Sequence, residues 1–104
     1  EKSRVLAALS AMAHETRLDL LRLLVSHSPQ GLAQGDLARQ LAVSASGLAF
    51  PLAQLEQAGL VSARRESRNV YYAADPAGIG RVLGYVLRDC CQSHPEIAAC
   101  CQRI

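Results

Sequence analysis

Residues 37–72 read LARQLAVSASGLAFPLAQLEQAGLVSARRESRNVYY, and this stretch decides the fold. A short helical segment over residues 32–41 leads through a tight turn into a second amphipathic run. The inward stripe of that run consists of leucines at helical spacing, namely Leu48, Leu52 and Leu55. Ser44 is a favourable N-cap for the second helix, and Gly59 favours its end near residue 58. Two short helices joined in this way form a helix-turn-helix, which we place at about residues 33–58.

The segment over about residues 60–73 predicts a β-hairpin, because its β-branched and aromatic ends flank a polar, arginine-bearing centre. A hairpin placed directly after a helix-turn-helix forms a wing. The second helix then lies in the DNA major groove, while hairpin arginines reach phosphates or the minor groove. The candidate DNA contacts are Ser44, Ser46, Gly47 and Gln54 from the helix and Arg64, Arg65 and Arg68 from the wing. The alternative is that these polar residues only coat a solvated surface.

Helical segments on both sides complete a mainly α fold with a small β-hairpin. Residues 3–12 and 16–25 carry apolar residues at helical spacing. Asp75 followed by Pro76 provides an N-cap and a proline at the first helical position, so a long C-terminal helix is expected to start there. Ser93, followed three residues later by an acidic residue, favours a last short helical turn.

We expect one winged helix-turn-helix domain over residues 1–104, with a dimerisation and thiol segment over about residues 76–104. The four arginines of residues 31–72 exceed the acidic residues there by only one charge, so a single copy would bind duplex DNA weakly. A homodimer formed through the first and last helices doubles the phosphate contacts and reads a two-fold operator site.

Composition excludes several other classes of protein. The chain has 104 residues, of which 50% are hydrophobic and 19% charged, with a net charge of +2, as expected for one folded domain. Only 4% of the residues are aromatic, which argues against a base-stacking surface for single strands. Charged or polar residues interrupt every apolar run before the length of a membrane span, so we expect a cytoplasmic protein that does not enter a membrane.

An enzyme that uses a pair of neighbouring thiols is the competing class of function. The sequence has no Gly-rich nucleotide loop and no Cys-x-x-Cys motif to support it, so we predict a protein that is not an enzyme. A winged helix that binds a protein instead of DNA is a further alternative, and Pro51 in the second helix is the feature that favours it.

The four cysteines form two adjacent pairs near one end of the chain: Cys90, Cys91, Cys100 and Cys101. A stapling disulfide framework spreads cysteines along the chain to close long loops. Two clustered pairs instead indicate a thiolate site for a soft ion, or a redox switch. Cys90 also continues an apolar helical stripe, so a role as a small core residue is its alternative interpretation.

Several segments together resemble the ArsR/SmtB family of metal-responsive winged-helix repressors. They are AMAHETRLDLL at residues 11–21, LAQLEQAGLV at residues 52–61 and RRESRNVYY at residues 64–72. The resemblance covers nearly the whole chain, and it implies a homodimer that represses its own operon and leaves DNA when an inducer binds.

Two departures from the family pattern shape the prediction. Many members carry a cysteine motif on the helix before the recognition helix, but residues 34–37 here read QGDL. Pro51 stands where the family often has histidine, so the recognition helix either kinks there or starts later than Ser44. The C-terminal thiols instead resemble those of the family's arsenite sensors.

The resemblance implies that arsenite or methylarsenite releases the protein from DNA by binding C-terminal thiolates. Trivalent arsenic is soft and bonds about three thiolates, whereas structural zinc prefers a closed tetrahedron of nitrogen and sulfur ligands. A site for zinc or cadmium and a thiol-redox switch of the same fold are the alternatives. The residues leave open which of Cys100 and Cys101 is a ligand, whether the site lies within one chain or across the dimer, and the operator sequence.

Overall fold

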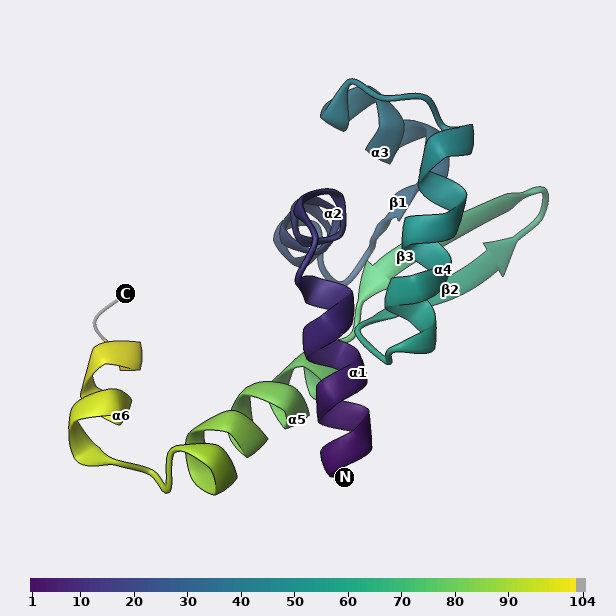
Figure 1. Cartoon of the computed structure of the whole chain (residues 1–104). Helices are drawn as coiled ribbons and strands as arrows, with labels where there is room; N and C mark the ends of the chain where they lie inside the picture. Colours follow the sequence, from purple (N-terminus) through teal and green to yellow (C-terminus); the bar gives the residue numbers. More distant parts are fainter. Residues whose placement is uncertain (103–104) are drawn as a thin grey trace.

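The computed structural model describes residues 1–102, which form helices packed around a small antiparallel sheet (Figure 1). The N-terminal elements are α1 (Lys2–Met12), α2 (Glu15–Ser26), β1 (Leu32–Ala33) and α3 (Gln34–Leu41). A 3-10 turn (Ser46–Leu48) then precedes α4 (Ala49–Gln57), β2 (Val61–Glu66) and β3 (Asn69–Ala74). The C-terminal elements are α5 (Pro76–Tyr85), a π-helical turn (Val86–Cys90) and α6 (Pro95–Gln102). The predicted mainly α fold with a hairpin wing is confirmed.

The sheet has a third strand that the sequence did not predict. β1 pairs antiparallel with β3, with Leu32 opposite Tyr72, and the strand order is β1-β3-β2. The helix predicted over residues 32–41 therefore starts at Gln34. A strand of two residues is too short to show the alternation by which strands are recognised in a sequence.

The recognition helix α4 starts later than Ser44, which resolves the question raised by Pro51. Pro51 is the third residue of α4, where a backbone N–H has no partner within the helix, so proline there removes no helical hydrogen bond. Ser44 still acts at this end, because its hydroxyl accepts a hydrogen bond of 3.3 Å from the N–H of Gly47.

The two helices of the helix-turn-helix end in the same way. After α4, Gly59 has a φ of +79°, and the N–H of Leu60 donates to the carbonyl of Leu55. After α3, Ala42 has a φ of 57°, and the N–H of Val43 donates to the carbonyl of Ala38. Both ends are Schellman motifs, one with the usual glycine and one with alanine in the left-handed region.

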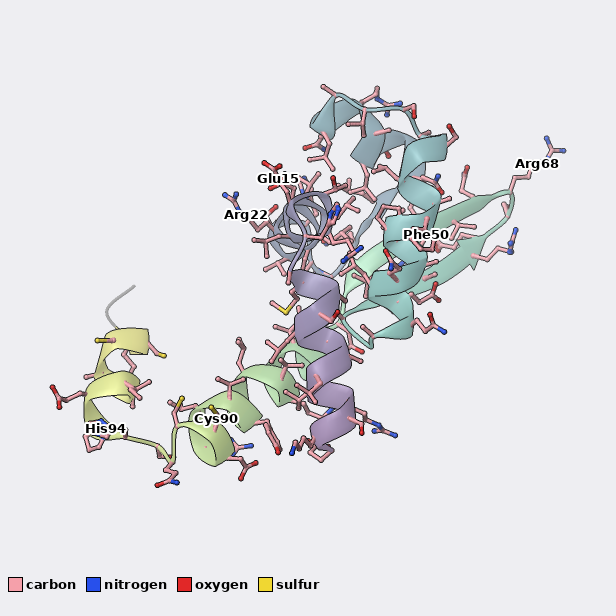
Figure 2. All side chains as sticks on the ribbon, in the orientation of Figure 1. Glu15, Arg22, Phe50, Arg68, Cys90 and His94 are labelled. Atoms are coloured by element: carbon pink, nitrogen blue, oxygen red, sulfur yellow. The ribbon has the colours of Figure 1, made fainter. Side chains whose placement is uncertain are left out.

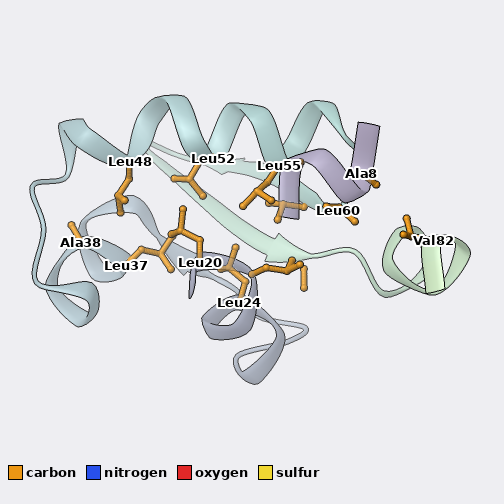
Figure 3. Packing of buried hydrophobic residues seen from close by; sticks show 14 of the residues in the cluster. Ala8, Leu20, Leu24, Leu37, Ala38, Leu48, Leu52, Leu55, Leu60 and Val82 are labelled. Carbon is orange, nitrogen blue, oxygen red and sulfur yellow. The ribbon is translucent and has the colours of Figure 1, made fainter. Parts of the chain in front are cut away.

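Leucines from α2, α3 and α4 form the centre of the core (Figure 3). The largest fully buried side chains are Leu20, Leu24, Leu37, Leu48, Leu52, Leu55 and Leu60. On α2, helical spacing predicts an inward face made by Leu18, Leu21, Leu24 and Val25. This is partly wrong, because Leu18 and Val25 are exposed, while Leu20 beside that face is buried. The predicted inward stripe of α4 is confirmed.

The C-terminal part of the chain projects from this core. The chain continues from α5 through the π-helical turn to Cys90, then turns back into α6, which stands away from the rest of the molecule in Figure 1. No residue of α6 is buried, and the molecule measures 47 × 28 × 22 Å. The radius of gyration of 14.8 Å exceeds the roughly 13 Å expected for a compact domain of this length. We call residues 86–102 the thiol arm.

The start of α6 differs from the sequence prediction. Ser93 has a φ of +51° and is not the cap. The Nδ1 atom of His94 instead accepts a hydrogen bond of 3.2 Å from the N–H of Glu96. Since α6 starts at Pro95, His94 occupies the position just before the helix, where a side-chain acceptor satisfies a free N–H.

Candidate DNA interface and thiol arm

The exposed face of α4 and the turn before it form the candidate DNA-reading surface. The fold directs the leucine stripe inward, so Ser46, Gly47 and Phe50 lie on the opposite face, and all three are exposed. Ser44 is also exposed, with its hydroxyl turned to the N–H of Gly47. Three of the four predicted helix contacts thus lie at the amino-terminal end of the recognition helix, where helix-turn-helix proteins contact base edges.

Gln54 is engaged elsewhere. Its Oε1 atom accepts a hydrogen bond of 2.6 Å from Nη1 of Arg17, and Nε of Arg17 donates to the carbonyl of Ala11 at 2.6 Å. Arg17 therefore ties α4 to the junction between α1 and α2. The sequence does not predict this role of Arg17, because no local pattern signals a bond between residues so far apart in the chain.

The three arginines of the hairpin differ in their surroundings. The Arg64 guanidinium lies 3.3 Å from Glu66 Oε1 and 3.3 Å from the carbonyl of Gln30, with its Cζ 5.2 Å from the ring centre of Tyr71. Arg65 pairs with Val70 across the hairpin and therefore points to the other face of the sheet. Arg68 stands at the tip of the hairpin (Figure 2). All three arginines are exposed, but Arg64 is held by these contacts along the sheet.

The hairpin ends in a tight turn that projects Arg68. Glu66 and Asn69 close the ladder, so the loop consists of Ser67 and Arg68. Ser67 has a φ of +58°, which is the conformation that two-residue hairpin loops require at their first position. The short loop therefore places Arg68 at the far end of the hairpin, where its side chain is exposed.

Phe50 belongs to this surface but is not among the predicted DNA contacts. It is the most exposed of the large hydrophobic side chains in the described part of the chain, at 71%. Its signal in the sequence is an aromatic residue two positions away from both Leu48 and Leu52, which places it opposite the leucine stripe.

The structure places the four cysteines on the two sides of one turn. Cys90 ends the π-helical turn and Cys91 follows it, while Cys100 and Cys101 lie on α6. All four are free thiols, with Cys91 half-buried and the others exposed. The alternative of Cys90 as a core residue is therefore wrong. Figure 2 shows Cys90 and His94 at either end of the loop that joins the π-helical turn to α6. The Nδ1 atom of the His94 ring accepts the hydrogen bond from the N–H of Glu96.

The pKa of Cys91 depends on thiols from both pairs of cysteines. Loss of solvent raises the pKa of the Cys91 thiol above its ordinary value, and a hydrogen bond with Cys90 and the charges of Cys90 and Cys101 act in the same direction. Within residues 1–102, however, no three His, Cys, Asp or Glu side chains already surround a point that would hold a metal ion. The donors are soft, but a three-thiolate site requires the thiol arm to rearrange from the conformation described here.

The described helices include none that is long and apolar enough to cross a membrane.

A helix-turn-helix followed by an arginine-bearing hairpin defines this protein as a winged helix-turn-helix DNA-binding protein. A helix-turn-helix domain family matches residues 12–63, which is half of the chain. The chain is 36% identical over 89 residues to the putative arsenical resistance operon repressor ArsR2 of Halobacterium salinarum, covering 86% of this chain and 72% of that relative. The chain belongs to the ArsR family of transcriptional regulators, and it is a regulator rather than an enzyme.

Further relatives agree with this assignment. The nodulation protein NolR of Rhizobium meliloti is 37% identical over 76 residues, which cover 73% of this chain and only 60% of NolR. An ArsR-like transcriptional regulator from Rhodococcus sp. RHA1 superimposes with a TM-score of 0.78 at 25% identity, over 97% of this chain and 92% of that one. The homodimeric winged helix-turn-helix domain of Mb0332 from Mycobacterium bovis has a TM-score of 0.67 at 25% identity, over 88% and 85%.

Proposed function

We propose that this chain is a homodimeric repressor that binds operator DNA and leaves it when trivalent arsenic, as arsenite or methylarsenite, binds the thiolates of the arm. The observation that carries the proposal is the continuity of the arm with α5. The two thiol pairs lie at one end of this continuous segment, and the other end of α5 packs against the exit of the recognition helix.

The DNA-binding part of the proposal rests on the exposed amino-terminal end of α4 and on the hairpin tip. Serine hydroxyls and arginine guanidinium groups are donors suited to phosphates and base edges. Ser46 in the 3-10 turn before α4 and Arg68 at the tip of the hairpin present such donors to solvent. The recognition helix α4 and the β2–β3 hairpin belong to the same winged helix-turn-helix unit, so one DNA duplex can contact both.

The homodimer rests on apolar surface that the single chain leaves uncovered. Leu6 on α1 is 57% exposed and Leu83 on α5 is 55% exposed, and α1 and α5 contact each other. Exposed leucines on adjacent helices form an apolar surface that a second copy can cover. The homodimeric Mycobacterium bovis neighbour supports this arrangement.

The arsenic part of the proposal rests on the chemistry of the donors. Thiolates are the ligands that soft ions prefer, and the pairs Cys90–Cys91 and Cys100–Cys101 supply them on both sides of one turn. A relative named as a putative arsenical resistance operon repressor adds support. An inducer shifts the protein off DNA only if it binds one conformation better than the other, and the projecting arm offers a segment whose position can change.

The connection from the arm to α4 is short. The N–H of Asp75 donates to the carbonyl of Leu60 at 2.9 Å, and Asp75 Oδ1 accepts from the N–H of Gly78 at 3.1 Å. The first bond joins the start of α5 to Leu60, which lies between α4 and β2, and the second caps the amino-terminal end of α5. A shift of α5 within the dimer therefore changes the spacing of the two recognition helices.

The test is a fluorescence-anisotropy titration of a labelled fragment from upstream of the gene, using the reduced protein with and without effector. Arsenite, methylarsenite, zinc, cadmium and a mild oxidant are compared. We expect trivalent arsenicals alone to release the DNA, and the double variant Cys90→Ser, Cys91→Ser to bind DNA normally but to ignore arsenite. If only zinc, cadmium or the oxidant releases the DNA, that agent is the inducer and arsenic is not. If arsenite still releases the double variant, the inducer binds at a site other than Cys90 and Cys91.

A further inference from the structure

The recognition surface of this chain has an unusual composition. Residues 44–58 contain no lysine, arginine or asparagine, and Glu56 is their only charged residue. Arginine and lysine read guanine, and asparagine and glutamine read adenine, through bidentate hydrogen bonds in the major groove. Of these residue types the segment has only Gln54, whose Oε1 atom accepts a hydrogen bond from Arg17, and Gln57, which is the last residue of α4. This helix therefore has few groups for reading bases by hydrogen bonding.

The side chain that does project from this surface is apolar. Phe50 is 71% exposed, on the face opposite the buried leucines. Helical spacing places it among side chains that are small or short, namely Ser46, Gly47 and Ala53. Small neighbours let the helix backbone approach the floor of a groove closely, and the exposed ring of Phe50 then reaches furthest into it.

We propose that Phe50 reads operator DNA through apolar contact with the 5-methyl group of a thymine in the major groove. This inference rests on the proposed operator-binding function. The thymine methyl is the apolar group that the base edges present in the major groove, and phenylalanine is among the side chains that contact it.

A protein partner suits this surface less well. Docking sites for proteins are contiguous apolar patches, whereas Ser46, Gly47 and Gln57 share the outer face of the helix with Phe50. A single aromatic ring among polar and small residues matches a single methyl group better than it matches an apolar interface.

The experiment removes the methyl group and leaves base pairing intact. Duplexes that bind the wild-type protein are selected from a random-sequence library, and the tightest is resynthesised with deoxyuridine at each thymine in turn. Anisotropy then gives the affinities of the wild-type protein and of Phe50→Ala for each duplex. At one thymine in each half-site, we expect deoxyuridine to weaken wild-type binding about fourfold, and about fifteenfold when both half-sites are changed.

The Phe50→Ala variant decides the assignment. Because both protomers carry the change, it should bind the thymine duplex about as weakly as the wild-type protein binds the duplex with deoxyuridine in both half-sites, and deoxyuridine should weaken its binding no further. Phe50→Leu, which keeps an apolar side chain, should retain part of the loss of affinity that deoxyuridine causes in the wild-type protein. Val25→Ala is the matched control, because Val25 is an exposed apolar residue at 51% on α2, and it should keep the full wild-type penalty.

The possible failures are distinguishable. If no thymine shows a penalty in the wild-type protein, or if the penalty persists in Phe50→Ala, the thymine contact is wrong while operator binding stands. If Phe50→Ala changes the oligomeric state and leaves DNA affinity unchanged, the residue belongs to a protein interface. If the selection enriches no duplex, the proposed function itself fails.

Discussion

Gly78 of α5 lies directly against the carbonyl oxygen of Gly59, because a Cβ atom added at Gly78 would be 1.9 Å from that oxygen. Gly59 is the left-handed residue that ends the recognition helix, with a φ of +79°. The helix that continues into the thiol arm is thus in van der Waals contact with the exit of the helix proposed to read DNA. Only a residue without a side chain permits this approach.

This contact predicts that Gly78→Ala lowers the free energy of unfolding by about 2 kcal/mol, because the methyl group has to displace the backbone of one element. Gly80→Ala is the matched control, since no atom lies within 4 Å of a Cβ added there. Alanine stabilises a helix interior relative to glycine, so that variant should gain about 1 kcal/mol. Urea denaturation at one protein concentration measures both, and equal effects would refute the contact.

Ala42 predicts a second change in stability. It holds the left-handed position of the α3 Schellman motif, with a φ of 57°, where glycine is the usual residue. Ala42→Gly should therefore raise the free energy of unfolding by about 1 kcal/mol. The same substitution at Ala53, an exposed position inside α4, should lower it by about 1 kcal/mol. A loss of stability at both sites would contradict the strained conformation of Ala42.

The sequence predicted those parts of the fold that local patterns determine. The leucine stripe of α4 and the ending at Gly59 follow from helical spacing and from the conformational freedom of glycine. The pairing of β1 with β3 did not follow, because two residues carry no periodicity. The start of α4 was placed too early, since Ser44 has the chemistry of a cap whether the next turn is α-helical or 3-10.

The candidate sites were predictable to a similar degree. The residue types of the wing and of the thiol arm were evident in the sequence, but their individual surroundings were not. The bond between Arg17 and Gln54 joins residues 37 positions apart, and no spacing rule reaches that far. The approach of Cys101 to Cys91 depends on a turn in which Gln92 and Ser93 both have positive φ, a conformation that these residue types do not signal.

The hairpin tip predicts how DNA binding depends on salt. Arg68→Ala should weaken binding about equally for all sequences, and it should reduce the slope of log affinity against log salt by about 1 per protomer. Arg22→Ala is the control, because Arg22 is an exposed arginine on α2, away from the hairpin (Figure 2), and it should leave the slope unchanged. Anisotropy titrations at several salt concentrations measure the slopes. An unchanged slope in Arg68→Ala would remove the tip from the DNA interface.

The surroundings of Cys91 in the thiol arm predict how its reactivity depends on pH. Because desolvation and the neighbouring Cys90 and Cys101 raise the pKa of Cys91, its thiolate forms only at a higher pH than that of an ordinary thiol. Iodoacetamide reacts with the thiolate. The midpoint of Cys91 alkylation against pH, measured by mass spectrometry of the peptides, should therefore lie above the usual range for a thiol.

Cys90→Ala should lower the pH at the midpoint of Cys91 alkylation, since it removes both the hydrogen bond and the charge of Cys90. Cys100→Ala should leave it in place, because Cys100 is not among the groups that raise the pKa of Cys91. If Cys90→Ala leaves the midpoint unchanged, the two adjacent thiols do not interact, and the arm would not present them as a pair to a soft ion.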